Sequence, residues 1–138
     1  MSSVHDLIID EMLNWTKANF PVNEKTLVHT DTTEGHDLFE KPRKIFDSIP
    51  DIYIRHMTEP KYRVIGEAKT RRDKDLKHLK EQLSDYLRFI SIHKETHFCF
   101  FAQEPIFSIG NKLIERSGNS QKFFSEKRIH LVEYPDEI

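Results

Sequence analysis

The stretch that most constrains the fold runs from residue 48 to residue 93. Two runs rich in β-branched residues, Asp51–His56 and Lys61–Thr70, are separated by Met57-Thr58-Glu59-Pro60. This spacing predicts two strands joined as a hairpin. Leucine and isoleucine then recur at helical spacing through Arg71–His93, which predicts a long helix with one buried side. A strand–strand–helix unit of this kind indicates an α/β protein.

The flanking segments also alternate between helical and strand patterns. They predict a helix at Ser3–Asn19 with Ser3 as its N-cap, a strand at Thr26–Thr30, a polar loop at Asp31–Asp47, a buried strand at His97–Gln103, a helix at Pro105–Arg116 and a strand at Ile129–Tyr134. The predicted order is α-β-β-β-α-β-α-β, which implies a mixed sheet with helices on both faces. The chain has 138 residues and no repeat or linker, so one domain spanning 1–138 is expected.

The single cysteine and the absence of long apolar runs bear on the compartment. Cys99 lies in the run His-Phe-Cys-Phe-Phe, so we expect a core residue and no disulfide, which is typical of a reducing, cytoplasmic setting. No apolar run approaches the ~18 residues of a membrane span. The segment Val4–Asp10 is acidic rather than a basic lead into a signal sequence. We therefore expect a soluble protein that is neither exported nor bound to a membrane.

Charge is unevenly distributed along the chain. The formal net charge of −2 argues against a protein that coats nucleic acid through bulk charge. Eight cations nevertheless gather in one segment: Lys61, Arg63, Lys69, Arg71, Arg72, Lys74, Lys77 and Lys80. Of these, Arg71, Arg72, Lys74 and Lys77 are predicted to contact nucleic-acid phosphates. A solvated helix with ion pairs between successive turns explains the same pattern equally well.

Glu67 and Lys69 stand two positions apart on the second predicted hairpin strand. Side chains alternate along a strand, so both project from the same face. Ala68 projects from the opposite, apolar face together with Val64 and Gly66. An acid and a lysine at the end of an apolar strand fit either a catalytic pair or a structural ion pair.

Asp51 joins this pair in one hairpin register. It stands opposite Glu67 if Met57 stands opposite Lys61, and both carboxylates then share a face. A shift by one residue would separate them. Two carboxylates, a cation and a polarised water are what metal-dependent phosphodiester hydrolysis requires, because Mg²⁺ prefers oxygen ligands.

Three further residues are candidates for this site. Gln82 and Tyr86 lie one turn apart on the long helix and lean toward the strand ends, although Tyr86 also suits the edge of a core and Gln82 also suits solvent. Glu11 falls in the middle of the apolar stripe formed by Val4, Leu7, Ile8, Trp15 and Ala18 on the first helix. It is interpreted either as an auxiliary ligand for metal or water, or as a marginal residue that pairs with a cation.

Pro50-Asp51, Glu67-Ala68-Lys69 and Gln82-x-x-x-Tyr86 occur in this order on strand, strand and helix. The arrangement resembles the PD-(D/E)xK nuclease superfamily, which includes Holliday-junction resolvases, virus-type replication-repair nucleases and RecB-like nucleases. The resemblance covers roughly Val4 to His93 and implies a three-layer α/β/α restriction-endonuclease-like fold. Many members carry a glycine before the Pro-Asp, where this chain has Asp47-Ser48-Ile49.

The resemblance also implies roles for individual residues. Asp51, Glu67 and the carbonyl of Ala68 would bind Mg²⁺ or Mn²⁺, Lys69 would position water or stabilise the transition state, Glu11 would assist, and Gln82 with Tyr86 would form an auxiliary motif. DNA is the expected substrate and RNA the alternative, and a homodimer would present two sites to a double-stranded or branched substrate. The alternative function is a catalytically inactive module of this fold that binds nucleic acid or a protein partner.

Overall fold

The protein is an α/β structure built around a five-stranded mixed sheet. A computed structural model describes residues 3–31, 41–58 and 61–135, so most of the predicted loop at Asp31–Asp47 and half of the predicted hairpin turn lie outside the described residues. Within those ranges, the helices are α1 (Val4–Asn19), α2 (Leu76–Ile92), α3 (Ile106–Glu115) and α4 (Ser120–Ser125), and the strands are β1 (Thr26–Thr30), β2 (Ile52–His56), β3 (Arg63–Lys69), β4 (Thr96–Ala102) and β5 (Ile129–Glu133).

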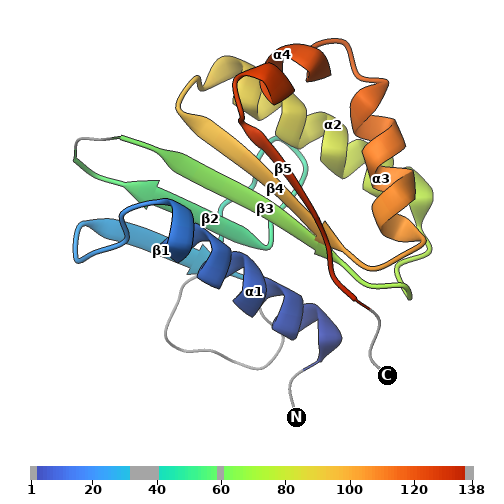
Figure 1. Ribbon diagram of the computed structural model, residues 1–138, viewed down its shortest axis with the longest axis horizontal. Coiled ribbons are helices and arrows are strands. Elements are labelled where there is room, and N and C mark those ends of the chain that lie inside the picture. The colour runs from blue at the N-terminus through green and yellow to red at the C-terminus, as the bar shows by residue number, and fades with distance from the viewer. Residues whose placement is uncertain (1–2, 32–40, 59–60, 136–138) are drawn as a thin grey trace.

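The strands follow one another across the sheet in chain order, β1-β2-β3-β4-β5. β1, β2 and β3 pair antiparallel, whereas β3, β4 and β5 pair parallel. The last residues of β3, β4 and β5 therefore lie at one edge of the sheet, and α1 begins near the same edge (Figure 1). Side chains from β2, β3 and the start of α1 can meet there.

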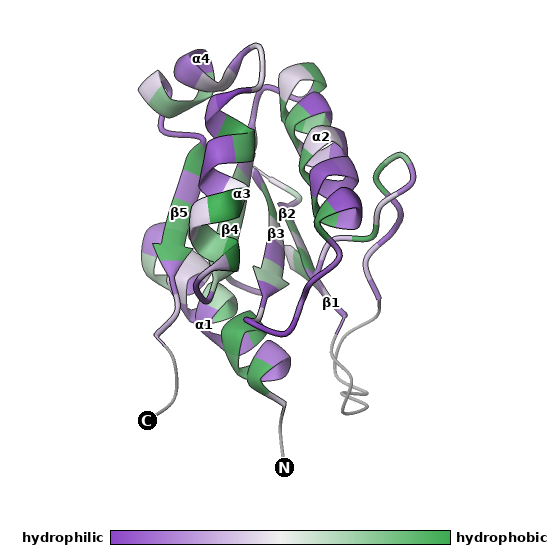
Figure 2. Cartoon of the chain, turned by 90° about the vertical axis from the view of Figure 1, so that its right-hand side faces the viewer, coloured by the Kyte–Doolittle hydropathy of each residue, from purple (hydrophilic) through white to green (hydrophobic). Residues whose placement is uncertain are grey.

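Helices cover both faces of the sheet, as predicted. α1 lies on one side, and α2, α3 and α4 lie on the other (Figure 1). Two hydrophobic clusters result, because alternate residues of β4 face opposite ways: Phe98 and Phe100 pack toward α2, while Cys99 and Phe101 pack toward α1. The prediction that Cys99 is a core residue is confirmed. Figure 2 shows hydrophobic and hydrophilic residues alternating along α2 and α3, as helices with one buried side require.

The predicted helix at Ser3–Asn19 is confirmed, and Ser3 caps it by accepting a hydrogen bond from the amide of Asp6. Its predicted buried stripe is confirmed only in part: Ile8 is buried, and Val4 and Trp15 pack partly buried against the same cluster. The buried residues are Asp6, Ile8, Ile9, Met12 and Thr16, so the inward face is turned by about 100°, one residue step, from the predicted one. Thr16 tolerates burial because its hydroxyl donates to the carbonyl of Met12 at 2.9 Å.

The long helix begins later than predicted. Arg71–Asp75 is not helical, because the carboxylate of Asp73 accepts hydrogen bonds from the amide and hydroxyl of Thr70 and closes a turn. Asp75 then caps α2 by accepting from the amide of His78 at 3.0 Å. The short helix α4 was not predicted, since six residues are too few to show a helical period. No helix within the described residues is long and apolar enough to cross a membrane.

Candidate active site

The hairpin register predicted for Asp51 and Glu67 is confirmed. Ile52 pairs with Gly66 and Arg55 pairs with Arg63, so the next position along the ladder sets Asp51 opposite Glu67. The amide of Asp51 donates to the carbonyl of Gly66 at 2.8 Å, which holds this end of the hairpin closed. Both carboxylates therefore project from the face that α2 covers.

The two carboxyl groups are buried and interact directly. Asp51 is 4% exposed and Glu67 is 3% exposed. Burial raises the pKa of Asp51 to about 6. Three interactions act in the opposite direction: the hydrogen bond with Glu67, the hydrogen bond from the amide of Ala68, which lies 2.7 Å from Oδ2, and the charge of Lys69. Burial and the neighbouring Asp51 raise the pKa of Glu67 well above its usual value. Two acids forced together in this way favour a positive charge between them.

Lys69 provides one such charge. Its side chain is 11% exposed, and Nζ lies 3.8 Å from Oε2 of Glu67. Its charge lowers the pKa of both carboxyl groups, but burial outweighs it in each. The contact is at the long limit for an ion pair, so Lys69 does not neutralise the two acids by itself. Lys69 therefore keeps a positive charge beside the two acids in a largely buried setting.

Gln82 and Tyr86 both reach Glu67 from α2. The hydroxyl of Tyr86 donates to Oε1 of Glu67 at 2.5 Å, and Nε2 of Gln82 makes a longer contact of 3.4 Å to the same oxygen. Tyr86 is fully buried and also packs against Phe98, so it belongs to the core and to the site at once. Gln82 is buried rather than solvated, and its Oε1 has no hydrogen-bond partner among the described residues.

His5 lies in the site although it was not predicted there. Glu11 was predicted there and lies outside it. Nε2 of His5 lies 3.2 Å from Oδ1 of Asp51, and Nδ1 lies 3.8 Å from Oδ1 of the buried Asp6. Glu11 is exposed, so the expectation that it points inward is wrong. A signal for His5 was present: His5, Ile9, Met12 and Thr16 repeat at helical spacing, but hydropathy alone ranked this face below the other.

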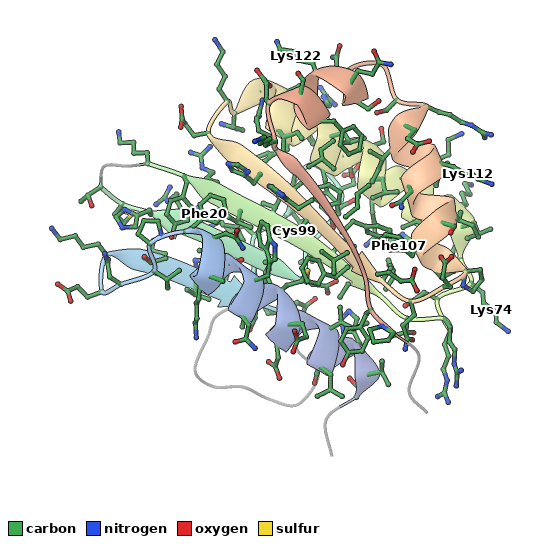
Figure 3. All side chains as sticks on the ribbon, in the orientation of Figure 1. Phe20, Lys74, Cys99, Phe107, Lys112 and Lys122 are labelled. Carbon is green, nitrogen blue, oxygen red and sulfur yellow. The ribbon has the colours of Figure 1, made fainter. Side chains whose placement is uncertain are left out.

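The four predicted phosphate-binding cations lie where the chain leaves β3. Arg71, Arg72, Lys74 and Lys77 are all exposed, and Lys74 extends away from the body of the protein (Figure 3). They do not form one helix face, because only Lys77 belongs to α2. Arg71 and Arg72 line a cavity of about 420 Å³ together with the first residues of α1, including His5.

The donor atoms at the acid pair suit a hard divalent cation. Within the described residues, no three His, Cys, Asp or Glu side chains gather closely enough to hold a metal ion. Asp51 and Glu67 nevertheless supply carboxylate oxygens, and the side-chain amide of Gln82 contacts Glu67 through Nε2. Two buried carboxylates beside an amide that can also offer an oxygen fit an oxygen-ligated cation such as Mg²⁺ or Mn²⁺. The chemistry of Asp51 and Glu67 thus fits the metal that the resemblance implies.

Known proteins offer no further guide to this site. What this site can do therefore follows from its own geometry, that is, from the positions of Asp51, Glu67, Lys69, Gln82 and Tyr86. The same holds for the basic segment beside them. No family model, curated protein or solved structure matches this chain.

Proposed function

We propose that the protein is a metal-dependent nuclease that hydrolyses phosphodiester bonds in DNA, on a restriction-endonuclease-like fold of the PD-(D/E)xK type. One observation carries the proposal: Asp51 and Glu67 meet as a buried pair, with Nζ of Lys69 3.8 Å from Glu67. Burying two acids side by side is costly, and such perturbed pairs cluster at functional sites, so a binding or catalytic role is the explanation that we favour over a structural ion pair. The order of α1, β1, β2, β3, α2 and β4 supports the αβββαβ core that the resemblance implies.

The metal would be held by Asp51 and Glu67. The resemblance implies that the carbonyl of Ala68 would be a further ligand, and Oε1 of Gln82 would offer another oxygen. When bound, Mg²⁺ or Mn²⁺ would neutralise charge on the attacked phosphate and polarise a water molecule. The raised pKa values of the two acids describe the pair without that charge. A cation would favour their ionised forms.

The chain's own residues would position the reacting groups. Lys69 places an ammonium group at the rim of the acid pair, where it would stabilise negative charge on the phosphate as water attacks phosphorus and the bond to the leaving oxygen breaks. Tyr86 holds Oε1 of Glu67, and His5 contacts Oδ1 of Asp51, so each carboxylate is oriented from a different helix. Arg71 and Arg72 would hold adjacent phosphates of the substrate strand.

The test is incubation of the protein with Mg²⁺ or Mn²⁺ and labelled linear, flapped and four-way-junction DNA, with RNA of the same sequences alongside. We expect cleavage of DNA that requires the metal and disappears in Lys69→Ala and Asp51→Asn. Lys17→Ala is the matched control, because Lys17 is exposed on α1 and far along the helix from His5.

Each alternative has its own outcome. Cleavage that persists in Lys69→Ala would assign the activity to another site or to a contaminant. Binding of DNA without cleavage, and with no rise in melting temperature on adding metal, would favour the inactive binding module. Sedimentation of the free and DNA-bound protein tests the predicted homodimer.

A further inference from the structure

A second cavity lies at the opposite end of the β2–β3 hairpin from the acid pair. It measures about 460 Å³ and is lined by the end of β2, the start of β3 and the connection from α2 to β4. Arg63, which lines it, stands four positions before Glu67 on β3, which corresponds to roughly 13 Å along the strand. This cavity is therefore separate from the candidate active site.

Cations dominate the lining of this cavity. Arg55, Lys61, Arg63 and Lys94 contribute to it, and Glu95 is the one acid among the described lining residues. None of the four cations forms an ion pair with another residue in the described part of the chain. The positive charge in this cavity is thus left for a ligand or solvent to balance.

Two of these cations oppose each other directly. Arg55 and Arg63 are cross-strand partners in the β2–β3 ladder, and like charges in this position destabilise a sheet. The guanidinium group of Arg63 makes no hydrogen bond to the described residues, and its Nε is also shielded from water. Burial and, to a lesser degree, the charge of Arg63 lower the pKa of His93 at the cavity wall. An anion placed between the two arginines would relieve this repulsion.

The helix end beside the cavity does not oppose an anion. The carboxyl end of α2 would normally present partly negative carbonyl groups. Here the buried guanidinium of Arg128 donates to the carbonyls of Ile90, His93 and Thr96. The end of α2 is therefore already satisfied by a positive charge of its own.

The cavity also has an apolar side. Met57 and Ile92, which line it, are 51% and 57% exposed, the two most exposed large hydrophobic residues among those described. A ligand that carries an apolar ring next to its negative charge would cover both kinds of surface. The volume of about 460 Å³ lies within the usual range for small-molecule sites.

We propose that this cavity binds a nucleotide phosphate, with the phosphate between Arg55 and Arg63 and the base against Met57 and Ile92. The ligand chemistry is a phosphate ester that carries a base, supplied by a free mononucleotide or by the terminal nucleotide of a strand. The site is independent of the proposed cleavage, because it shares no residue with the acid pair.

The test is calorimetric titration at low salt with AMP, inorganic phosphate, adenosine, and one oligonucleotide with and without a 5′-phosphate. We expect AMP or the 5′-phosphorylated strand to bind, and Arg63→Gln to weaken that binding about tenfold or more. Arg116→Gln is the matched control, because it removes an exposed arginine outside the cavity. If Arg63→Gln does not fold, Arg55→Gln takes its place, since either change removes one of the opposed charges.

The probes distinguish the two ligand sources and the two sites. AMP binding indicates a free nucleotide, whereas binding of the 5′-phosphorylated strand alone indicates a strand end. Binding must also persist in Glu67→Ala, so its loss there would place the ligand at the acid pair and overturn the proposal. The proposal is equally overturned if no probe binds, or if binding is unchanged in both Arg63→Gln and Arg55→Gln.

Discussion

The hydroxyl of Tyr86 lies 2.5 Å from Oε1 of Glu67, so a fully buried ring of the core ends on a carboxylate of the candidate active site. Tyr86→Phe removes this hydrogen bond and keeps the ring. We expect the free energy of unfolding to fall by about 1–2 kcal/mol, because a buried acceptor loses its best donor. Tyr53→Phe is the control, since the Tyr53 hydroxyl has no hydrogen bond within the described residues, and it should change stability by less than about 0.5 kcal/mol. Urea unfolding of both variants checks this. Equal losses would mean that the hydrogen bond contributes nothing.

Asp51→Asn should stabilise the metal-free protein while abolishing metal binding. Asparagine keeps an oxygen for the amide of Ala68, which donates to Oδ2 of Asp51, but it removes one of two buried like charges. We expect a gain of about 1–2 kcal/mol at pH 8. Millimolar Mn²⁺ should raise the melting temperature of the wild-type protein and not that of the variant.

Asp10→Asn is the control for this experiment, because Asp10 is exposed on α1 and its substitution should leave both measurements unchanged. A variant Asp51→Asn that is less stable than wild type in the absence of metal would contradict a repulsive acid pair. Scanning calorimetry with and without Mn²⁺ makes both comparisons.

How far the fold follows from sequence depends on how local its determinants are. The β2–β3 hairpin, including its register, was predictable because a short connection leaves few ways to pair two apolar strands. The orientation of α1 was not, because its buried face includes a polar residue, Thr16, whose hydroxyl is satisfied within its own helix. The late start of α2 depends on two local hydrogen bonds: Asp73 closes a turn with Thr70, and Asp75 caps the helix at His78. The helical sequence pattern does not show either of them.

The candidate site shows the same division. Asp51, Glu67 and Lys69 were predictable because the period of a strand assigns each side chain to a face. The positions of Tyr86 and Gln82 were predictable from their helical spacing relative to the leucine and isoleucine residues that recur along the same helix. The sequence carried a signal for His5 in its helical spacing, but choosing His5 over Glu11 needs the rotation of α1 against the sheet, which is a property of tertiary packing.

The paired histidines on β4 and β5 should make stability depend on pH. Nδ1 of His97 lies 3.0 Å from Nε2 of His130, whose ring also packs against Trp15. Burial and the nearby His97 lower the pKa of His130 to about 4, and burial with the charge of Arg128 lowers the pKa of His97. Below about pH 6.5 the unfolded chain binds protons that the folded protein excludes, so the free energy of unfolding falls as pH falls toward 4.

His130→Phe isolates this effect, because phenylalanine keeps the ring contacts and cannot titrate. Both rings are partly exposed, so we expect the wild-type protein to lose about 1 kcal/mol more than the variant between pH 7 and pH 4.5. The contributions of the carboxyl groups are common to both proteins and cancel in the difference. Parallel stability curves for the two proteins would exclude the histidine pair as the cause.

Gly110 and Gly118 should respond oppositely to alanine. A Cβ at Gly110 would lie 2.3 Å from the ring of Phe100, whereas a Cβ at Gly118 would have no neighbour within 4 Å. Gly110→Ala should therefore lower the free energy of unfolding by about 2–3 kcal/mol through overpacking. Gly118→Ala should leave it unchanged or raise it by up to about 1 kcal/mol, because alanine restricts the unfolded chain. Urea unfolding of the pair checks both signs, and a Gly110→Ala protein as stable as wild type would contradict the tight helix–sheet contact.

The placement of the acid pair on one hairpin has a consequence for folding kinetics. Asp51 and Glu67 come together as soon as β2 pairs with β3, while both are still surrounded by water. In the folded protein both are buried, and α2 places Tyr86 over Glu67. If the hairpin forms before α2 docks, the repulsion between the carboxylates is overcome at the docking step, and replacing either acid should then speed folding.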